Sequence, residues 1–436
     1  MKKVILAILL FAATFCVTAQ EANKYTKIDS LLNYLYTNKK FMGSLAIREK
    51  GEVVFSGTYG YSDLAGGISA NENTKYKIGS ITKMFTASII FQLIEEKKLT
   101  LDTRLSVYYP KIKNSDSITI GNMLNHTSGI YNFTDDSTLL FTKPQNRRDL
   151  LERLYSYEPV FDPGTKTTYS NSNYLLLGYI IQDITGKTYK ENVTKRIINK
   201  VGLKNTYYFT KINPRKNEAY SYELESGDWA TVNEWDESVA GAAGALQSTP
   251  EDLTQFITAL FNEKIIKKES LEEMTNLTMG MGKGIMAFPF GERRFFGHNG
   301  SIEGFESVVA FYPPDKMAIS LISNGLDYNF NNIMIGVLSC YYKIPYRFPD
   351  FTTITIGDES LKVYEGDYKN DGLPFTINVK AVDGKLRIHA DEQGTFYAQP
   401  VSETEFIHNP SGIKIKFTKT GFTLLQNGTS TLFIKQ

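Results

Sequence analysis

The chain has 436 residues and a formal net charge of +1, from 48 Lys and Arg residues against 47 Asp and Glu residues. This balance argues against a nucleic-acid-binding surface and against attraction to an anionic membrane. The length suffices for one large domain and a smaller one. Two cysteines, no CxxC pair and four scattered histidines argue against a zinc site, so we expect neither a metal ion nor another cofactor.

The first residues have the pattern of a secretory signal peptide. A basic start at residues 1–3 is followed by an apolar stretch over residues 4–15 and by small residues up to Ala19. We predict cleavage after Ala19, which leaves a periplasmic or secreted protein with no membrane span. Lipid anchoring through Cys16 is an alternative that the bulky Phe15 disfavours, and an uncleaved N-terminal anchor is another.

Helical and strand patterns then alternate through most of the chain. Apolar residues recur at helical spacing over residues 25–38, and two strands over residues 43–49 and 52–57 are joined by a tight turn. Further helices are predicted over residues 80–97, 120–125, 149–155, 174–181, from 250 onward and over 332–342, and strands over 295–300, 305–312 and 317–323. This mixture of elements predicts an α/β (α+β) domain.

The pattern changes after Pro345 and Pro349. From Phe351 onward, short alternating strands are separated by turns such as Asp383-Gly384, which predicts an all-β module, either a small barrel or a sandwich. The predicted organisation is a signal peptide over residues 1–19, a main domain over residues 20–345 and a C-terminal β domain over residues 351–436.

The stretch around Ser80 carries the first candidate catalytic residues. A serine hydroxyl is a poor nucleophile until a neighbouring group takes its proton. Lys83 follows Ser80 by about one helical turn, so its amine can reach the serine oxygen. The apolar residues over 84–94 predict a buried helix, and burial lowers the pKa of a lysine and makes it a usable base.

The spacing Ser-x-x-Lys alone is a weak signal. It occurs a second time from Ser411 to Lys414, in a strand-like and turn-rich stretch where we interpret it as chance. Ser80 could also be a helix cap with Lys83 on a solvated face. The apolar helix that follows, together with two motifs further along the chain, favours the catalytic interpretation.

Tyr169 and Asn171 form a Tyr-x-Asn motif on a loop just before an apolar helix over residues 174–181. A tyrosine near an ammonium group can have a lowered pKa and can relay protons to and from the serine and the leaving group. Asn171 offers an amide that can hold a substrate carbonyl. His126, at the end of the short helix predicted over residues 120–125, is interpreted as a structural histidine.

His298 and Gly300 form the third motif, His-x-Gly. On an edge strand, Gly300 would let a substrate approach the backbone closely. The backbone amide of Ser301 could pair with that of Ser80 as an oxyanion hole. His298 would supply polarity or a proton donor, and the alternative is an ordinary hydrogen-bonded strand histidine.

Ser-x-x-Lys, Tyr-x-Asn and His-x-Gly, in this order, resemble the serine β-lactamase and penicillin-binding-protein superfamily. Tyr-x-Asn is similar to the second motif of class C β-lactamases. His-Asn-Gly stands where Lys-Thr-Gly is usual, which looks more like secreted D-Ala-D-Ala carboxypeptidases, D-aminopeptidases and related esterases. The resemblance covers roughly residues 28–342 and implies an antiparallel sheet flanked by helices with an all-α cluster. The module after Phe351 is similar to β-barrel domains appended to some members.

The resemblance implies a serine hydrolase whose acyl-enzyme is formed on Ser80. Its substrate would be an amide or ester, above all a small D-amino-acid peptide of the cell-wall type, as for a D-Ala-D-Ala carboxypeptidase or a D-aminopeptidase. An esterase of the same fold, a β-lactamase and a non-catalytic penicilloyl-binding sensor stay open as alternatives. The implied catalytic residues are Ser80, Lys83 and Tyr169, and the implied substrate-binding residues are Asn171, His298, Gly300 and Ser301.

Overall fold

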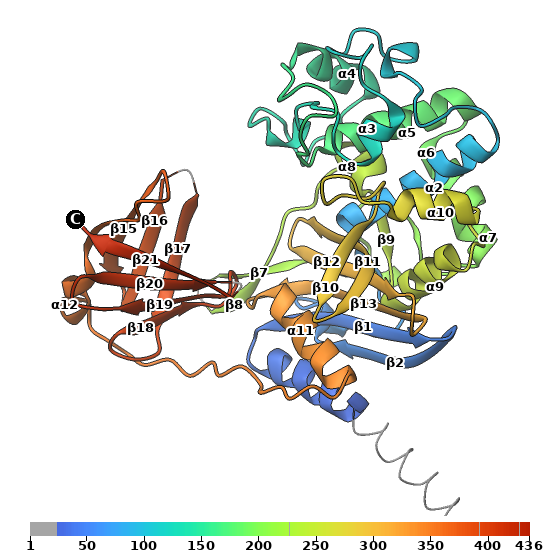
Figure 1. Ribbon diagram of the computed structural model, residues 1–436. Helices are drawn as coiled ribbons and strands as arrows, with labels where there is room; N and C mark the ends of the chain where they lie inside the picture. The colour runs from blue at the N-terminus through green and yellow to red at the C-terminus, as the bar shows by residue number, and fades with distance from the viewer. Residues whose placement is uncertain (1–23, 226, 392, 427) are drawn as a thin grey trace, which may run out of the picture. The chain divides into compact units, whose positions relative to one another are not determined.

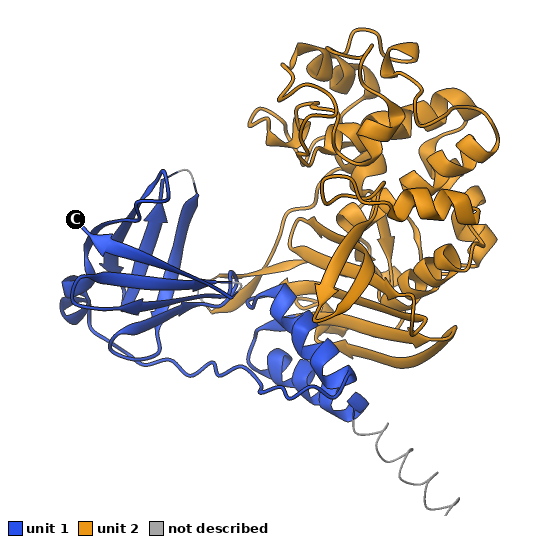
Figure 2. Ribbon diagram, in the orientation of Figure 1, with its two compact units in different colours: residues 1–41, 326–436 blue, residues 42–325 orange. Residues whose placement is uncertain are grey.

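The computed structural model describes residues 24–225, 227–391, 393–426 and 428–436. The predicted signal peptide, its cleavage after Ala19 and the possible lipid anchor at Cys16 lie outside these residues. The chain divides into two compact units, Met42–Gly325 and the described residues up to Phe41 together with Leu326–Gln436 (Figure 2). The domain boundaries drawn from the sequence stay a prediction. None of the described helices is long and apolar enough to cross a bilayer.

The larger unit contains a mainly antiparallel sheet with the strand order β10-β11-β12-β13-β1-β2 (Figure 1). The predicted hairpin is confirmed, since Lys50 and Gly51 turn between β1 and β2 with φ angles of 48° and 98°. Hairpin β7–β8 joins through one parallel pair, Gly325 with Tyr222. The strands are β1 (Phe41–Glu49), β2 (Glu52–Tyr59), β7 (Tyr222–Glu225), β8 (Asp228–Thr231), β10 (Met286–Phe290), β11 (Arg293–Ile302), β12 (Phe305–Tyr312) and β13 (Met317–Leu326).

Two smaller sheets and most of the helices complete this unit. Helices α3 to α6 gather in a cluster above the main sheet in Figure 1. The small sheets consist of β3 (Tyr61–Asp63) with β4 (Ile68–Ser69), and of β5 (Tyr76–Lys77), β9 (Leu246–Ser248) and β6 (Tyr207–Tyr208). The helices are α2 (Thr82–Glu95), α3 (Ile120–Leu124), α4 (Arg147–Ser156), α5 (Asn171–Thr185), α6 (Tyr189–Val193), α7 (Asn199–Val201), α8 (Glu237–Gly244), α9 (Pro250–Phe261) and α10 (Lys268–Thr275), with short turns η1 (Gly79–Ile81), η2 (Leu105–Val107), η3 (Phe133–Asp135), η4 (Thr194–Ile198) and η5 (Pro214–Lys216).

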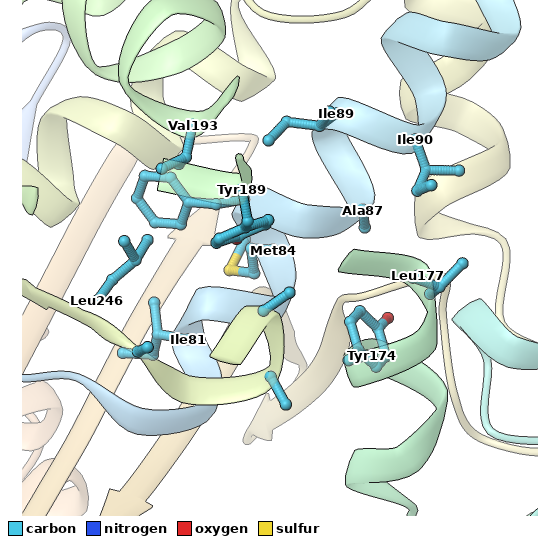
Figure 3. Close-up of a cluster of buried hydrophobic side chains, with 14 of the residues drawn as sticks. Ile81, Met84, Ala87, Ile89, Ile90, Tyr174, Leu177, Tyr189, Val193 and Leu246 are labelled. Carbon is cyan, nitrogen blue, oxygen red and sulfur yellow. The ribbon is translucent and has the colours of Figure 1, made fainter. Parts of the chain in front are cut away.

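Helix α2 runs through the hydrophobic core of the larger unit. Every residue from Thr82 to Leu93 is buried, as the apolar run predicted. Figure 3 shows its side chains among Tyr174 and Leu177 of α5, residues of α6 and Leu246 of β9. Burying side chains of this size contributes about 1.5–3 kcal/mol each. Any polar group on this helix is therefore held in an apolar, rigid surrounding.

The C-terminal strands form a closed barrel of eight antiparallel strands, so of the two predicted alternatives the barrel is correct. Aromatic residues such as Tyr368, Phe406 and Phe422 fill its interior. The same unit contains the helix over residues 24–37, α11 (Phe330–Tyr341), α12 (Asp358–Leu361) and η6 (Lys362–Tyr364). The barrel strands are β14 (Gly366–Lys369), β15 (Thr376–Val382), β16 (Lys385–Ala390), β17 (Gly394–Pro400), β18 (Glu405–His408), β19 (Ile413–Phe417), β20 (Gly421–Gln426) and β21 (Thr429–Lys435). The predicted fold class is confirmed.

Candidate active site

Ser80 lies in turn η1, directly before the buried helix α2. Two glycines let this turn approach strand β11. A Cβ on Gly79, whose φ is 49°, would lie 2.8 Å from the carbonyl oxygen of Ser301. A Cβ on Gly300 would lie 2.1 Å from the carbonyl oxygen of Ile78. The backbone that carries Ser80 therefore touches the backbone that carries Ser301, as an oxyanion hole made of their two amides requires.

Gly300 has a role different from the one expected of a glycine on an edge strand. Strand β10 pairs with β11 only as far as Gly297, so residues 298–302 pair with β12 alone and contact η1 on their other side. The space for a side chain at Gly300 is filled by the protein itself, because the amide nitrogen of Ser80 would lie 3.0 Å from a Cβ there. The absence of a side chain at Gly300 therefore lets the backbone of Ile78 and Ser80 pack against it.

Lys83 is completely buried in the first turn of α2. Its Nζ lies 2.9 Å from Ser80 Oγ, 2.8 Å from Asn171 Oδ1 and 2.8 Å from the carbonyl oxygen of Ala243. Burial holds the pKa of the Lys83 amine well below its usual value. The lysine thus loses its proton more readily than an exposed lysine, as a general base requires.

Three acceptors surround Lys83 Nζ, which match the three N–H groups of an ammonium, and a neutral amine still satisfies two of them. The Asn171 side-chain oxygen and the Ala243 carbonyl only accept hydrogen bonds, so they take two N–H groups. A neutral amine then has one lone pair left, directed at the hydroxyl of Ser80. Lys83 Nζ donates to Ser80 Oγ at 2.9 Å, and because burial lowers the pKa of the amine, loss of its proton lets it accept the proton of Ser80 Oγ–H.

Tyr169 lies on the loop before α5, as predicted, and its hydroxyl donates a 2.7 Å hydrogen bond to Ser80 Oγ. The expectation that a neighbouring ammonium lowers its pKa is wrong, because burial raises the pKa of the phenol. Lys83 is itself disposed to be neutral and gives the phenol no compensating charge. Tyr169 therefore acts as a proton donor to the serine oxygen.

His126 is more than the residue at the end of α3, because its imidazole packs on the ring of Tyr169. Its Nδ1 accepts a 3.1 Å hydrogen bond from the backbone amide of Ser170. Burial holds its pKa well below the usual value, and the positive charge of a protonated Lys83 would lower it further. The sequence contained no signal for this contact, since His126 and Tyr169 are far apart along the chain.

Asn171 holds Lys83 and is itself held from the other side. Its backbone amide donates to Asn132 Oδ1 at 2.9 Å, and its Nδ2 donates to Thr134 Oγ1 at 3.0 Å. The second bond orients the side chain so that Oδ1 faces Lys83. Neither Asn132 nor Thr134 belongs to a recognisable motif, so sequence reasoning missed both.

His298 lies buried on β11, with its ring centroid 6.4 Å from that of Tyr169. Its Nδ1 is 2.5 Å from the carbonyl oxygen of Asn299, which can only accept, so Nδ1 carries the hydrogen and Nε2 has a free lone pair. Burial is the main cause that lowers the pKa of His298 to about 3, and the positive charge of a protonated Lys83 contributes to it. The ring is neutral and an acceptor at Nε2, which does not suit the alternative of a proton donor.

The structure brings all the sequence-predicted site residues to one place. Ser80, Lys83, Tyr169 and Asn171 are joined by hydrogen bonds, and the backbone of Gly300 and Ser301 lies against that of Ser80. The second Ser-x-x-Lys serine, Ser411, lies between β18 and β19 of the barrel. The assembled groups can supply a nucleophile, a base, a proton donor and two amides for an oxyanion.

The chain is similar in sequence and in fold to known proteins. The chain is 31% identical over 246 residues to the teichoic acid D-alanine hydrolase of Staphylococcus aureus (strain MRSA252), which covers 56% of this chain. It spans 59% of the length of that curated relative. A solved structure of the D-amino acid amidase from Ochrobactrum anthropi SV3 with L-phenylalanine amide superposes with a TM-score of 0.66 and 25% identity, covering 73% of this chain and 99% of the amidase.

The fold including the C-terminal part also has a counterpart. The octameric penicillin-binding protein homologue from Pyrococcus abyssi superposes with a TM-score of 0.66 at 24% identity, covering 94% of this chain and 99% of that one. The model of the family described as Beta-lactamase matches residues 39–334. Because this match takes in well over half of the 436 residues, the chain belongs to the Beta-lactamase family, within the serine β-lactamase and penicillin-binding-protein superfamily.

Proposed function

We propose that this protein is a secreted serine hydrolase that cleaves amide or ester bonds of D-amino-acid derivatives through an acyl-Ser80 intermediate. One observation carries the proposal: Ser80 Oγ lies 2.9 Å from Lys83 Nζ and accepts a 2.7 Å hydrogen bond from the hydroxyl of Tyr169. A hydroxyl between a neutral amine and a neutral phenol has a group that takes its proton and a group that gives one.

Acylation follows from these contacts. As Ser80 Oγ forms a bond to the substrate carbonyl carbon, its proton passes to the lone pair of Lys83. The carbonyl oxygen becomes an oxyanion held by the backbone amides of Ser80 and Ser301. When the bond to the leaving group breaks, Tyr169 donates its proton to the departing amine or alcohol, and the Lys83 ammonium restores the phenol proton.

Deacylation reverses the proton transfers with water as the nucleophile. Water attacks the ester carbon and loses a proton to the neutral Lys83 or through Tyr169. The bond to Ser80 Oγ breaks, and the serine regains its proton. The acid product leaves and the three side chains return to their starting protonation states.

The substrate class is supported by the neutral site and by the names of the relatives. His298 is neutral, and Arg293 and Arg294 lie at the other end of β11, about 13 Å or more along the strand from His298. A substrate carboxylate at this place would lack a permanent positive partner. Relatives are a D-amino acid amidase and a teichoic acid D-alanine hydrolase, and both names describe D-amino-acid derivatives. We therefore favour D-amino-acid amides and esters over D-Ala-D-Ala peptides.

The site of action is proposed from the N-terminal pattern. A basic start, an apolar stretch and small residues up to Ala19 have the pattern of a secretory signal peptide, which supports export. D-amino-acid derivatives of the cell wall would be met outside the cytoplasmic membrane. N-terminal sequencing of the protein purified from its host would give Gln20 as the first residue if cleavage follows Ala19.

A substrate panel tests the proposed function. Wild type, Ser80→Ala and Ser411→Ala are compared on D-alanine amide, a p-nitrophenyl ester, a D-Ala-D-Ala peptide and nitrocefin. We expect turnover of D-alanine amide or the ester by wild type and by Ser411→Ala, and no turnover by Ser80→Ala. Equal turnover by wild type and Ser80→Ala would refute acyl-Ser80 chemistry. Preference for nitrocefin would replace the proposed substrate by a β-lactam.

A further inference from the structure

A buried ion pair lies beside the two backbone segments that form the candidate oxyanion hole. Lys77 Nζ is 2.7 Å from Glu303 Oε1 and 3.3 Å from Glu234 Oε2. The side chains of Lys77 and Glu303 are 1% and 0% exposed. The backbone amide of Trp235 also donates to Glu303 Oε1, at 2.6 Å. Lys77 and Glu303 are enclosed, Glu234 is partly exposed, and none of the three takes part in the proton transfers described above.

The position of the pair along the chain is informative. Lys77 is the last residue of β5, three residues before Ser80, and Glu303 is in the turn between β11 and β12, two residues after Ser301. The ion pair therefore bridges the same two segments that touch at Gly79 and Gly300. Both ends of the bridge lie within a few residues of the amides that would hold the oxyanion.

A second bridge joins the same segments. The hydroxyl of Ser307 on β12 lies 3.0 Å from the carbonyl oxygen of Ile78 and 3.1 Å from that of Gly300, so its single hydrogen is shared between the two acceptors. Ser307 of β12 and the pair of Lys77 with Glu303 therefore join the backbone before Ser80 to the backbone around Ser301. Ser80 and Ser301 are far apart in the sequence, so the relative position of their backbone amides depends on non-covalent contacts such as these.

We propose that Lys77 and Glu303 are positioning residues, whose ion pair fixes the backbone amide of Ser80 relative to that of Ser301 in the oxyanion hole. The proposal rests on the acyl-Ser80 chemistry proposed above. An oxyanion hole stabilises the transition state only when both amides point at the developing charge, so small displacements reduce turnover strongly.

Stability alone explains the pair poorly. Replacing a buried ion pair by neutral residues is often neutral or stabilising, because desolvation offsets the attraction between the charges. Among the described residues, Glu303 Oε2 is buried without a hydrogen-bond partner, which is a further cost. Glu303 also has a φ of 55°, in the left-handed region where residues other than glycine are uncommon. The pair lies at a place where the backbone geometry matters for the proposed reaction.

The test is a double variant, Lys77→Met with Glu303→Gln, which removes the two buried charges. The remaining carboxylate, Glu234, is 18% exposed and still accepts a hydrogen bond from the amide of Ile212 at 2.9 Å. The matched control is Arg196→Met with Glu96→Gln, an ion pair of 2.6 Å at the far end of α2. We expect the test variant to lose at least tenfold in kcat on the p-nitrophenyl ester, with little change in KM. Inhibition by phenylboronic acid, whose adduct places an oxygen in the hole, should weaken by a similar factor.

Two conservative variants separate positioning from folding. Lys77→Arg keeps the charge pair and should keep most of the activity and the boronate affinity. Glu303→Asp keeps the charge but shortens the side chain by one methylene, so it should fold and lose kcat. It replaces the double variant as the test if the double variant does not fold. A folded double variant, or failing that Glu303→Asp, with wild-type kcat and wild-type boronate affinity would overturn the proposal.

The outcome for wild type distinguishes the two proposals. If wild type neither hydrolyses any substrate of the panel nor reacts with a fluorophosphonate at Ser80, the proposed function is wrong and the positioning role is wrong with it. If wild type is active and the variants match it, only the positioning role is wrong. A loss of thermal stability without a change in kcat would assign Lys77 and Glu303 to folding and would equally contradict the inference.

Discussion

The imidazole ring of His126 stacks on the phenol ring of Tyr169, with ring centroids 4.3 Å apart and ring planes 27° from parallel. The backbone is held at the same place: His126 Nδ1 accepts from the amide of Ser170, and its carbonyl oxygen accepts from the amide of Thr168 at 3.1 Å. His126 therefore holds the loop on both sides of Tyr169, whose hydroxyl must stay within reach of Ser80 Oγ.

Replacing His126 should slow acylation through Tyr169. For His126→Ala we expect about a tenfold lower rate of labelling by a fluorophosphonate, because a displaced general acid transfers protons poorly. The same change in a Tyr169→Phe background should cost nothing further. A full additional loss in that background would show that His126 acts by another route.

The two Ser-x-x-Lys serines should behave differently toward covalent probes. Ser80→Ala should abolish labelling by a fluorophosphonate or a penicillin probe, because the hydroxyl activated by Lys83 is gone. Ser411→Ala should label like wild type, since Ser411 Oγ is bound to His408 Nδ1 at 2.7 Å and Lys414 is paired with Glu405 at 2.7 Å. Mass spectrometry of labelled peptides checks both. If labelling disappeared in Ser411→Ala and survived in Ser80→Ala, the catalytic serine would be Ser411 and the assignment of Ser80 would be wrong.

Local patterns predicted much of this molecule. The Ser80–Lys83 spacing is an i to i+3 relation, so the helix alone brings the two side chains together. The start of α9 is equally local, because Thr249 caps the helix by accepting from the amide of Asp252 and Pro250 occupies its first position. The Gly-Ala-rich stretch over residues 241–245 packs closely on α5, since a Cβ on Gly178 would lie 2.3 Å from the Cβ of Ala242.

Contacts between distant parts of the chain could not be predicted in this way. The carbonyl of Ala243 on Lys83, the ring of His126 on Tyr169 and the pair of Lys77 with Glu303 all join segments far apart in the sequence. The direction of the Tyr169 pKa depends on the same contacts, since burial by the surrounding segments outweighs any nearby charge. Sequence spacing contains no measure of that burial.

Lys83→Met and Tyr169→Phe should each reduce acylation severely while the fold is kept. Because both residues move the proton of one hydroxyl, the double variant should be little worse than either single variant. Single-turnover labelling rates of the four proteins measure this. Rates that multiply in the double variant would mean that Lys83 and Tyr169 act independently. Thermal unfolding of each variant is the control for folding.

The lowered pKa of Lys83 should make stability depend on pH. In the unfolded chain the lysine keeps its ordinary value of 10.5, whereas in the folded chain burial holds it well below. Between these two values the unfolded state binds more protons, so the free energy of unfolding rises as pH rises. Below the folded value both states are protonated and this dependence disappears.

Lys83→Met is the variant that isolates the effect, because its side chain has no proton to bind. Denaturant unfolding from about pH 7 to about pH 10 should show that wild type gains stability relative to Lys83→Met as pH increases. In parallel, kcat/KM of wild type should fall as pH drops through the lowered Lys83 pKa, where the base becomes charged. Parallel stability curves for the two proteins would contradict a neutral, buried Lys83.

The last prediction concerns the substrate, and it depends on His298. With a pKa near 3, this imidazole is uncharged at neutral pH and cannot hold a substrate carboxylate by charge. A lysine has an ordinary pKa near 10.4 and keeps a positive charge far more readily. We therefore expect wild type to turn over nitrocefin poorly and D-alanine amide better, and His298→Lys to shift the ratio of the two kcat/KM values toward nitrocefin. The matched control is His389→Lys, the same change at a partly exposed histidine of the barrel, which should leave the ratio unchanged. Efficient hydrolysis of nitrocefin by wild type would show that a neutral third motif suffices for β-lactams. The proposed substrate would then be a β-lactam and not a D-amino-acid amide or ester.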